Sequence, residues 1–68
     1  MGTENIHNNV HSLRVKKGVT QQKLGDRVGV TRQTVIAIEK GNYVPSVSLA
    51  LKLAKFFNMS VEKLFYAK

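Results

Sequence analysis

The chain has 68 residues, which allow one small domain with a modest core and leave little support for a catalytic cleft. It contains no cysteine, so disulfide bonds and cysteine-based zinc sites are excluded, and stability must come from helix packing or from a partner subunit. Eleven Lys and Arg against four Asp and Glu give a net charge of +7, which favours a polyanionic partner, although a merely soluble basic surface would show the same charge.

The N-terminal residues 1–8 are polar apart from Ile6. They are expected to form either a disordered extension or a short extended segment. They lack the basic and apolar regions of a signal peptide, and no run in the chain reaches the roughly 18 to 20 apolar residues that span a bilayer. We therefore expect a cytoplasmic protein without membrane association.

A first helix is predicted from Asn9, a plausible cap, to about Lys17. Val10 and Leu13 give it one apolar stripe, and Gly18 supplies the stop.

Two threonines mark the starts of the next two helices. The hydroxyls of Thr20 and Thr31 can accept hydrogen bonds from the free N–H groups of a first turn. Each threonine also lies between apolar residues at the spacing of a hydrophobic staple. The staples are Val19 with Leu24, and Val30 with Val35. Gly29 ends the helix that begins after Thr20, so helices over about 21–28 and 32–40 are predicted, in a helix-turn-helix layout.

Gly25 lies inside the first of these helices, where glycine costs about 1 kcal/mol relative to alanine. The compensation that we expect is close approach of another backbone.

The helix over 32–40 has a buried stripe and an opposite arc. Val35 and Ile38 should point inward. The opposite arc holds Gln33, Ile36, Ala37 and Lys40, with Arg32 at its N-terminal flank. An isoleucine more often lies in the core than in a binding surface. We nevertheless expect Ile36 to be exposed, because Val35 and Ile38 already define the buried stripe.

The C-terminal third predicts two more helices. Ser46 caps a helix over about 47–57 that is apolar on most of its circumference, so burial on more than one side is expected. Ser60 caps a last helix, whose predicted apolar face is Val61, Leu64 and Phe65. The apolar residues near the C-terminus fit either a subunit interface or docking on the chain's own core.

The chain resembles the phage repressor and Cro family of small helix-turn-helix regulators. The matching residues are Thr20, Gln21, Leu24, Gly29, Val30, Thr31, Val35, Ile38, Glu39, Gly41 and Pro45. The likeness extends over about residues 9–66 and is greatest to short stand-alone members. It implies an all-α, five-helix, lambda-repressor-like DNA-binding domain over 1–68, with the motif at about 20–40. Some members add a strand pair between the two ends, and here Ile6 and residues 64–66 would supply it.

The resemblance implies some individual roles, and side-chain chemistry and position suggest others. It implies a structural ion pair between Arg14 and Glu39. At position 25 the family usually has alanine. Glycine keeps the small size that packing requires here, but it weakens the helix. Base contacts are expected on the outward arc: Arg32 to guanine, Gln33 to adenine, and Ile36 or Ala37 to a thymine methyl group. Phosphate contacts are expected from Gln21, Thr34, Lys40, Asn42 and Tyr43. Two alternatives stay open: Gln21 could be an ordinary surface residue, and Tyr43 could pack on the following helix.

Regulators of this kind usually bind palindromic double-stranded DNA as homodimers. The candidates for the dimer contact are the helix over 47–57 with Met59, Leu64, Phe65 and Tyr66. A helical ligand groove on the same surface is the competing use. Repression is expected rather than activation, while the operator and the target genes stay open.

Other classes of function are weaker. No enzyme signature is present, and no cofactor or small-molecule ligand is expected. His7 and His11 are four residues apart, but with only Glu4 nearby we expect no metal site. The remaining alternatives are a non-specific DNA binder and a helical module that docks a protein. RNA binding is disfavoured because clustered exposed aromatic residues are lacking.

Overall fold

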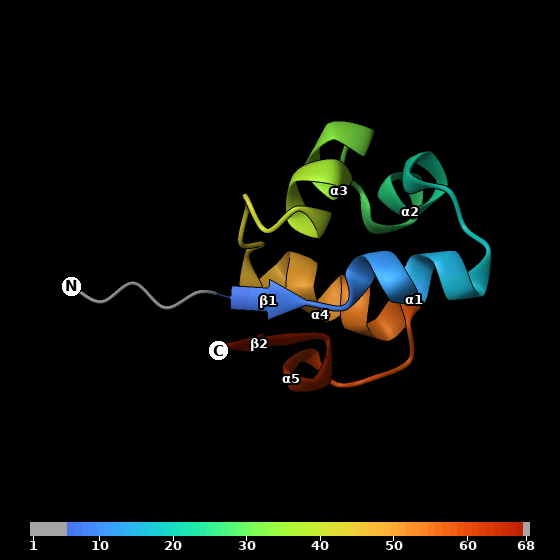
Figure 1. Ribbon diagram of the computed structural model, residues 1–68. Helices are drawn as coiled ribbons and strands as arrows, with labels where there is room; N and C mark the ends of the chain where they lie inside the picture. Colours follow the sequence, from blue (N-terminus) through green and yellow to red (C-terminus); the bar gives the residue numbers. More distant parts are fainter. Residues whose placement is uncertain (1–5, 68) are drawn as a thin grey trace.

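The computed structural model describes residues 6–67, which form five short helices and one pair of strands (Figure 1). In chain order these are β1 (Ile6–Asn8), α1 (Val10–Lys17), α2 (Gln21–Val28), α3 (Arg32–Glu39), α4 (Val47–Phe56), α5 (Val61–Leu64) and β2 (Phe65–Ala67). Helices α2 and α3 lie at one end of the molecule and α5 at the opposite end, with α1 and α4 between them. The expected five-helix, lambda-repressor-like fold with a strand pair is confirmed. Of the predicted N-terminal extension, residues 1–5 lie outside the described residues.

Three helix starts are capped as the sequence predicts, whereas Ser60, predicted to cap the last helix, makes no side-chain cap hydrogen bond. The side-chain oxygens of Thr20, Thr31 and Ser46 accept hydrogen bonds from backbone N–H groups three residues later, at 3.0, 3.2 and 3.1 Å. Each bond satisfies one of the N–H groups that a first turn leaves free. Gly29 takes the left-handed conformation, with φ at 81°, and so ends α2.

The start of α1 is built differently from the prediction. Asn9 stands at the cap position, but its side chain makes no cap hydrogen bond. Instead the Oδ1 atom of Asn8 accepts from the N–H of Val10 at 3.0 Å, and the Nδ2 atom of Asn9 donates to the carbonyl of Lys63 at 3.2 Å. Asn8 thus holds the first N–H of α1, and Asn9 joins the start of α1 to the C-terminal segment.

Strands β1 and β2 pair in antiparallel register and close the two ends of the domain. Ile6 lies opposite Ala67, and Asn8 lies opposite Phe65. The N–H of Asn9 extends the ladder to the carbonyl of Leu64 at 3.0 Å. The prediction that Phe65 belongs to the last helix is wrong, because its backbone is extended (φ −119°, ψ 134°) and begins β2.

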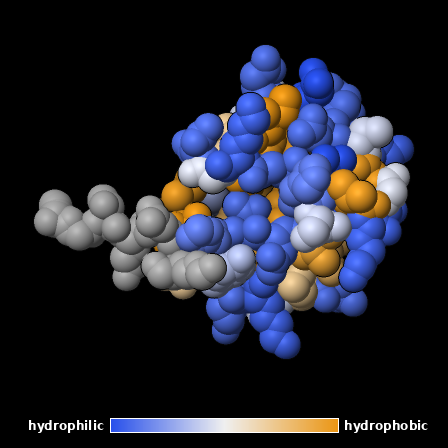
Figure 2. All heavy atoms as spheres, viewed as in Figure 1, coloured by the Kyte–Doolittle hydropathy of each residue, from blue (hydrophilic) through white to orange (hydrophobic). Residues whose placement is uncertain are grey.

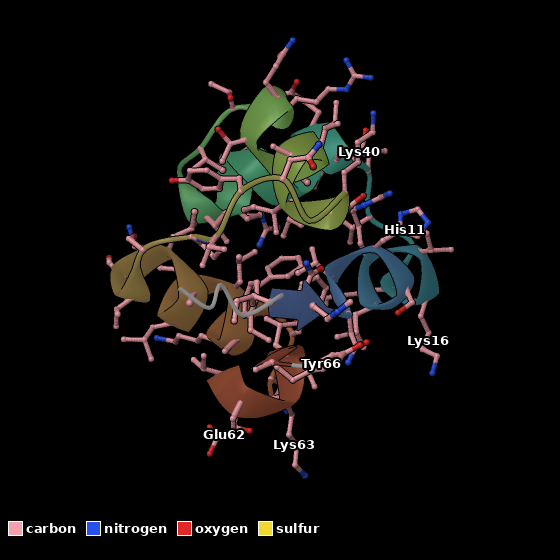
Figure 3. The ribbon with its side chains drawn as sticks, turned by 60° about the vertical axis from the view of Figure 1, so that its left-hand side comes forward. His11, Lys16, Lys40, Glu62, Lys63 and Tyr66 are labelled. Carbon is pink, nitrogen blue, oxygen red and sulfur yellow. The ribbon has the colours of Figure 1, made fainter. Side chains whose placement is uncertain are left out.

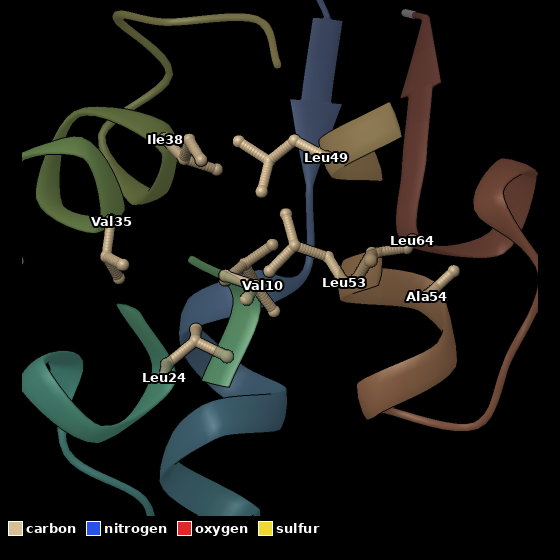
Figure 4. Packing of buried hydrophobic residues seen from close by; sticks show 9 residues of the cluster. Val10, Leu24, Val35, Ile38, Leu49, Leu53, Ala54 and Leu64 are labelled. Atoms are coloured by element: carbon tan, nitrogen blue, oxygen red, sulfur yellow. The ribbon is translucent and has the colours of Figure 1, made fainter. Parts of the chain in front are cut away.

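The core lies where all five helices meet (Figure 4). Its buried members are Val10, Leu24, Val28, Val35, Ile38, Leu49, Leu53, Ala54 and Leu64. Helix α4 contributes one face only. The expectation that α4 is buried on more than one side is wrong, since Val47 and Leu51 are exposed.

Close backbone approach explains Gly25. A Cβ atom at this position would lie 2.7 Å from the carbonyl oxygen of Val30 and 3.3 Å from the carbonyl carbon of Thr31. Both belong to the turn between α2 and α3, so the missing side chain lets this turn fold back against α2. The expected compensation for a glycine inside the helix is confirmed.

We predict that Gly25→Ala will not raise the free energy of unfolding. Alanine should contribute about 1 kcal/mol through helix propensity, but its Cβ forces the α2–α3 turn to shift, and overpacking costs about 1 to 3 kcal/mol. Urea denaturation of both proteins measures the difference. A gain of about 1 kcal/mol would contradict the close packing described here.

Candidate nucleic-acid interface

Helix α3 lies with α2 at the end of the molecule opposite α5 (Figure 1). Val35 and Ile38 anchor it in the core. Arg32 and Gln33, which begin the helix, are exposed, so their long polar side chains are available to a ligand. A helix anchored on one side and polar on the other fits the major groove of B-DNA.

Ile36 and Ala37 lie in the middle of the same arc and are half-buried. The expectation that Ile36 is exposed is therefore met only in part. What remains accessible of the two side chains is apolar. Such a surface suits the methyl group of a thymine rather than a base-edge hydrogen bond.

The residues expected at phosphates surround α3 unevenly. Lys40, Asn42 and Tyr43 are exposed and follow the helix, where Gly41, with φ at 80°, turns the chain. Thr34 is half-buried, and its hydroxyl lies 3.2 Å from that of Thr31, within hydrogen-bond distance. Lys40 points outward near His11 of α1 (Figure 3).

An ion pair ties the last residue of α3 to α1. The Nε atom of Arg14 donates to Oε2 of Glu39 at 2.6 Å, and its Nη2 atom donates to Oε1 at 3.3 Å. The third nitrogen, Nη1, donates to the carbonyl of Val19 at 2.9 Å. The side chains of Arg14 and Glu39 are only 12% and 6% exposed. The pair suggested by the family resemblance is thus present and nearly excluded from water.

Two further side chains reach the same carboxylate. Gln21, the first residue of α2, donates from Nε2 to Oε1 of Glu39 at 3.2 Å. His11 of α1 places Nδ1 3.1 Å from that oxygen. We call Glu39 with Arg14, Gln21 and His11 the Glu39 cluster. The side-chain amide of Gln21, predicted to face a phosphate, thus donates to Glu39. Sequence reasoning missed the role of His11 in this cluster, for which the only signal was its spacing of three residues from Arg14.

The pKa of Glu39 is lowered from its ordinary value of 4.5. Burial of the carboxyl group acts against this by raising the pKa. Hydrogen bonds from Arg14, His11 and Gln21, together with the positive charge of Arg14, outweigh burial and stabilise the carboxylate. The carboxylate therefore stays ionised below the pH at which it would protonate in the unfolded chain.

We predict that Glu39→Gln lowers the free energy of unfolding by about 3 kcal/mol at pH 7, because it leaves the buried Arg14 without a counter-charge. Since the pKa of Glu39 is lower in the folded state, its stabilisation is present above about pH 4.5 and is lost as the pH falls through the folded-state pKa. The difference between wild type and variant should shrink over that range.

The matched control is Glu62→Gln, at an exposed position of α5. Thermal unfolding of the three proteins between pH 3 and 7 measures the effect. Equal losses in both variants at pH 7 would show that the Glu39 cluster contributes nothing specific.

His7 and His11 make contacts in different parts of the structure. The ring of His7 stacks on Tyr66 at 5.8 Å between centroids, while His11 belongs to the Glu39 cluster. Residues 6–67 hold no group of three or more His, Cys, Asp or Glu side chains placed to bind a metal ion. Within the same residues no helix has the length and apolar character to cross a membrane.

The predicted dimer residues Met59, Leu64, Phe65 and Tyr66 differ in burial. Leu64 is completely buried in the chain's own core, so it is not available to a second subunit, and its assignment is wrong. Met59 and Phe65 are half-buried against the core, and Tyr66 is exposed. For Leu64 the alternative that the sequence left open, docking on the chain's own core, is the one that the structure shows.

Comparison with known proteins agrees with this geometry. The family model described as helix-turn-helix matches residues 10–64. The chain is 59% identical over 61 residues to YgzD, an uncharacterized HTH-type transcriptional regulator of Bacillus subtilis, covering 90% of this chain and 92% of that one. It is 33% identical over 55 residues to RstR, a cryptic phage CTXphi transcriptional repressor of Vibrio cholerae, covering 81% of this chain and 50% of that one.

A solved structure shows the same fold. The restriction-modification controller protein C.AhdI of Aeromonas hydrophila superposes with a TM-score of 0.73 at 29% identity, over 81% of this chain and 83% of that one. The chain therefore belongs to the helix-turn-helix family of Cro/C1-type transcriptional regulators. Members of this family bind DNA and are not enzymes.

Proposed function

We propose that this protein is a sequence-specific repressor that binds a palindromic operator in double-stranded DNA as a homodimer, with α3 in the major groove. The observation that carries the proposal is the pair of exposed polar side chains, Arg32 and Gln33, at the start of a helix whose other face is fixed in the core. As a DNA-binding regulator it would act in the cytoplasm.

Base recognition follows from the chemistry of these side chains. The guanidinium of Arg32 can donate two hydrogen bonds to O6 and N7 of guanine, and the amide of Gln33 can pair with N6 and N7 of adenine. Each such pair discriminates against a wrong base by about 1 to 3 kcal/mol. Ile36 or Ala37 would then contact a thymine methyl group.

Phosphate contacts would fix the position of α3 in the groove. Lys40, Asn42 and Tyr43 are exposed where the chain leaves α3, which supports their predicted role. Thr34 and Gln21 would contribute more weakly, because both already make hydrogen bonds within the protein. The bond to Glu39 uses one of the two N–H donors of the Gln21 amide. The backbone N–H groups of the first turn of α2 would supply further donors to the same phosphate.

Repression is supported by relatives. RstR of Vibrio cholerae is named a repressor, and a further relative of Acinetobacter baylyi, 38% identical over 56 residues, is named a competence pilus inhibition repressor. A dimer bound across a promoter would block transcription without needing any further surface.

The deciding experiment is selection of the protein's ligand from a randomised duplex pool at fixed, near-physiological salt. Sequencing of the retained DNA should give a two-fold symmetric consensus, with half-sites about 34 to 36 Å apart along the helix. Retention without enrichment would mean that the domain holds phosphates without reading bases, and no retention would direct attention to a protein partner.

We predict that Arg32→Ala relaxes the consensus at one position in each half-site. Loss of a bidentate contact with guanine should reduce discrimination there by about 1 to 3 kcal/mol and leave the other positions unchanged. Repeating the selection with the variant measures this. A consensus identical to that of the wild type would remove Arg32 from base recognition.

We predict a different signature for Lys40→Ala. A phosphate contact carries no sequence information, so the variant should bind every duplex more weakly and keep the same consensus. The slope of log K against log salt concentration should become shallower by about 0.9, because one fewer counterion is released. Lys63→Ala, on α5 at the opposite end of the molecule, is the control and should leave the slope unchanged (Figure 3).

A further inference from the structure

His11 reaches the Glu39 cluster from an exposed position. Its side chain is 64% exposed, whereas that of Glu39 is 6% exposed. The Nδ1 atom of His11 lies 3.1 Å from Oε1 of Glu39 and 3.2 Å from Nη2 of Arg14. Within residues 6–67 both contacts of this ring with the cluster use Nδ1. The other ring nitrogen, Nε2, is therefore the one left for a ligand from outside the protein.

The proton on the ring decides which contact Nδ1 makes. The guanidinium of Arg14 only donates hydrogen bonds, and the carboxylate of Glu39 only accepts them. A bare Nδ1 can accept from Arg14 but offers nothing to Glu39, whereas a protonated Nδ1 can donate to Glu39 but cannot accept from Arg14. Only the doubly protonated imidazolium donates to Glu39 and still has a second N–H, at Nε2, for an outside acceptor.

The first turn of α1 lies beside two places where phosphate contacts are expected. Gln21, at the start of α2, donates to the same Oε1 atom that His11 approaches. Lys40, directly after Glu39, lies near His11 (Figure 3). Figure 2 shows mostly hydrophilic side chains on this face at the end formed by α2 and α3. A DNA strand that contacts the start of α2 and the end of α3 therefore passes within reach of His11.

We propose that His11 is a further phosphate contact of this regulator, made through the Nε2–H of its imidazolium form, so that DNA binding takes up a proton. The inference rests on the proposed function, because it adds a contact to the same DNA-binding end. The Nδ1–H keeps the bond to Glu39, and the Nε2–H donates to a phosphate oxygen. Such a charge-assisted bond is about twice as strong as one between neutral groups.

The charges around His11 explain why the proton arrives together with DNA. Arg14 on α1 and Lys40 on α3 are positive, so they oppose a further positive charge on the ring. Glu39 on α3 is negative and favours that charge, while Gln21 on α2 is uncharged. A phosphate adds a second negative charge beside the ring and stabilises the imidazolium. Histidine is the side chain type that ordinarily changes charge between about pH 5 and 8, so this addition acts in the physiological range.

Proton uptake fixes the sign of the pH dependence. Since the complex holds more protons than the free protein, the affinity for DNA rises as the pH falls. A hydrogen bond to a charged group changes the affinity by about tenfold or more. The contact also releases one more counterion, so log K should fall with log salt concentration more steeply at pH 6 than at pH 8, by up to about 0.9 per copy.

The test is the affinity of the protein for DNA at pH 6 and pH 8 at fixed salt. It uses a duplex from the selected pool and an unrelated duplex of equal length, because a phosphate contact carries no sequence information. Wild type should bind both duplexes at least about tenfold more tightly at pH 6. His11→Gln should bind equally at the two pH values. His11→Lys, which is charged throughout this range, should also lose the pH dependence and should bind at pH 8 more tightly than wild type.

The matched control is His7→Gln, which removes the other histidine, whose ring stacks on Tyr66 of β2. It should keep the pH dependence of wild type. Equal affinity of wild type at the two pH values, or a pH dependence that survives in His11→Gln, would overturn the proposal. A loss in His11→Gln by the same factor at both pH values would also overturn it, since that result indicates a structural role within the Glu39 cluster. Circular dichroism checks that each variant is folded.

Nitrogen-15 NMR of the imidazole ring tests the same proton without a substitution. Addition of DNA at constant pH 7 should move both ring nitrogens of His11 toward their protonated values, and unchanged resonances would overturn the proposal. The proposed function fails in a different way. DNA binding without a consensus, but with the pH dependence, would remove sequence recognition and leave the His11 contact. A consensus bound equally at both pH values would do the reverse, and a protein that binds no DNA at either pH would overturn both.

Discussion

The arrangement of the DNA-binding end depends on one carboxylate. Glu39 ends α3, and its two oxygens hold hydrogen-bonding groups from α1 and from the first residue of α2. An isolated helix of eight residues has little stability of its own, so tertiary contacts must keep α3 helical and oriented. The core anchors Val35 and Ile38, and the Glu39 cluster fixes the end of the helix against its neighbours. The cost of burying this charge is offset because it is surrounded by donors.

The turn between α2 and α3 fixes the other end of α3. The absence of a Cβ atom at Gly25 lets the carbonyl of Val30 approach α2, and Thr31 caps α3 immediately afterwards. With both ends held, Arg32 and Gln33 project from a backbone that has little freedom to move. Preorganisation of this kind reduces the entropy lost on binding, and it lets a single short helix carry sequence discrimination.

Local chemistry explains why most of the fold was predictable from the sequence. Threonine and serine caps, staples and left-handed glycines act within a few residues, so they located α2, α3 and the start of α4. Contacts between distant residues were not predictable in the same way. The side chain of Asn9 donates to the carbonyl of Lys63 rather than capping α1, and the amide of Gln21 donates to Glu39. A helical wheel shows that α4 is apolar, but it does not show how many neighbours cover it, so the exposure of Val47 became visible only in three dimensions.

The central claim is that α3, held by the Glu39 cluster, is the surface that meets DNA. Its most direct test is an NMR titration of the isotopically labelled protein with its selected duplex, following backbone amide shifts and intermolecular nuclear Overhauser effects. The account predicts intermolecular contacts from the side chains of Arg32, Gln33 and Ala37 to base protons in the major groove, with the cluster unchanged. Contacts confined to α4 or α5, with α3 unaffected, would contradict it.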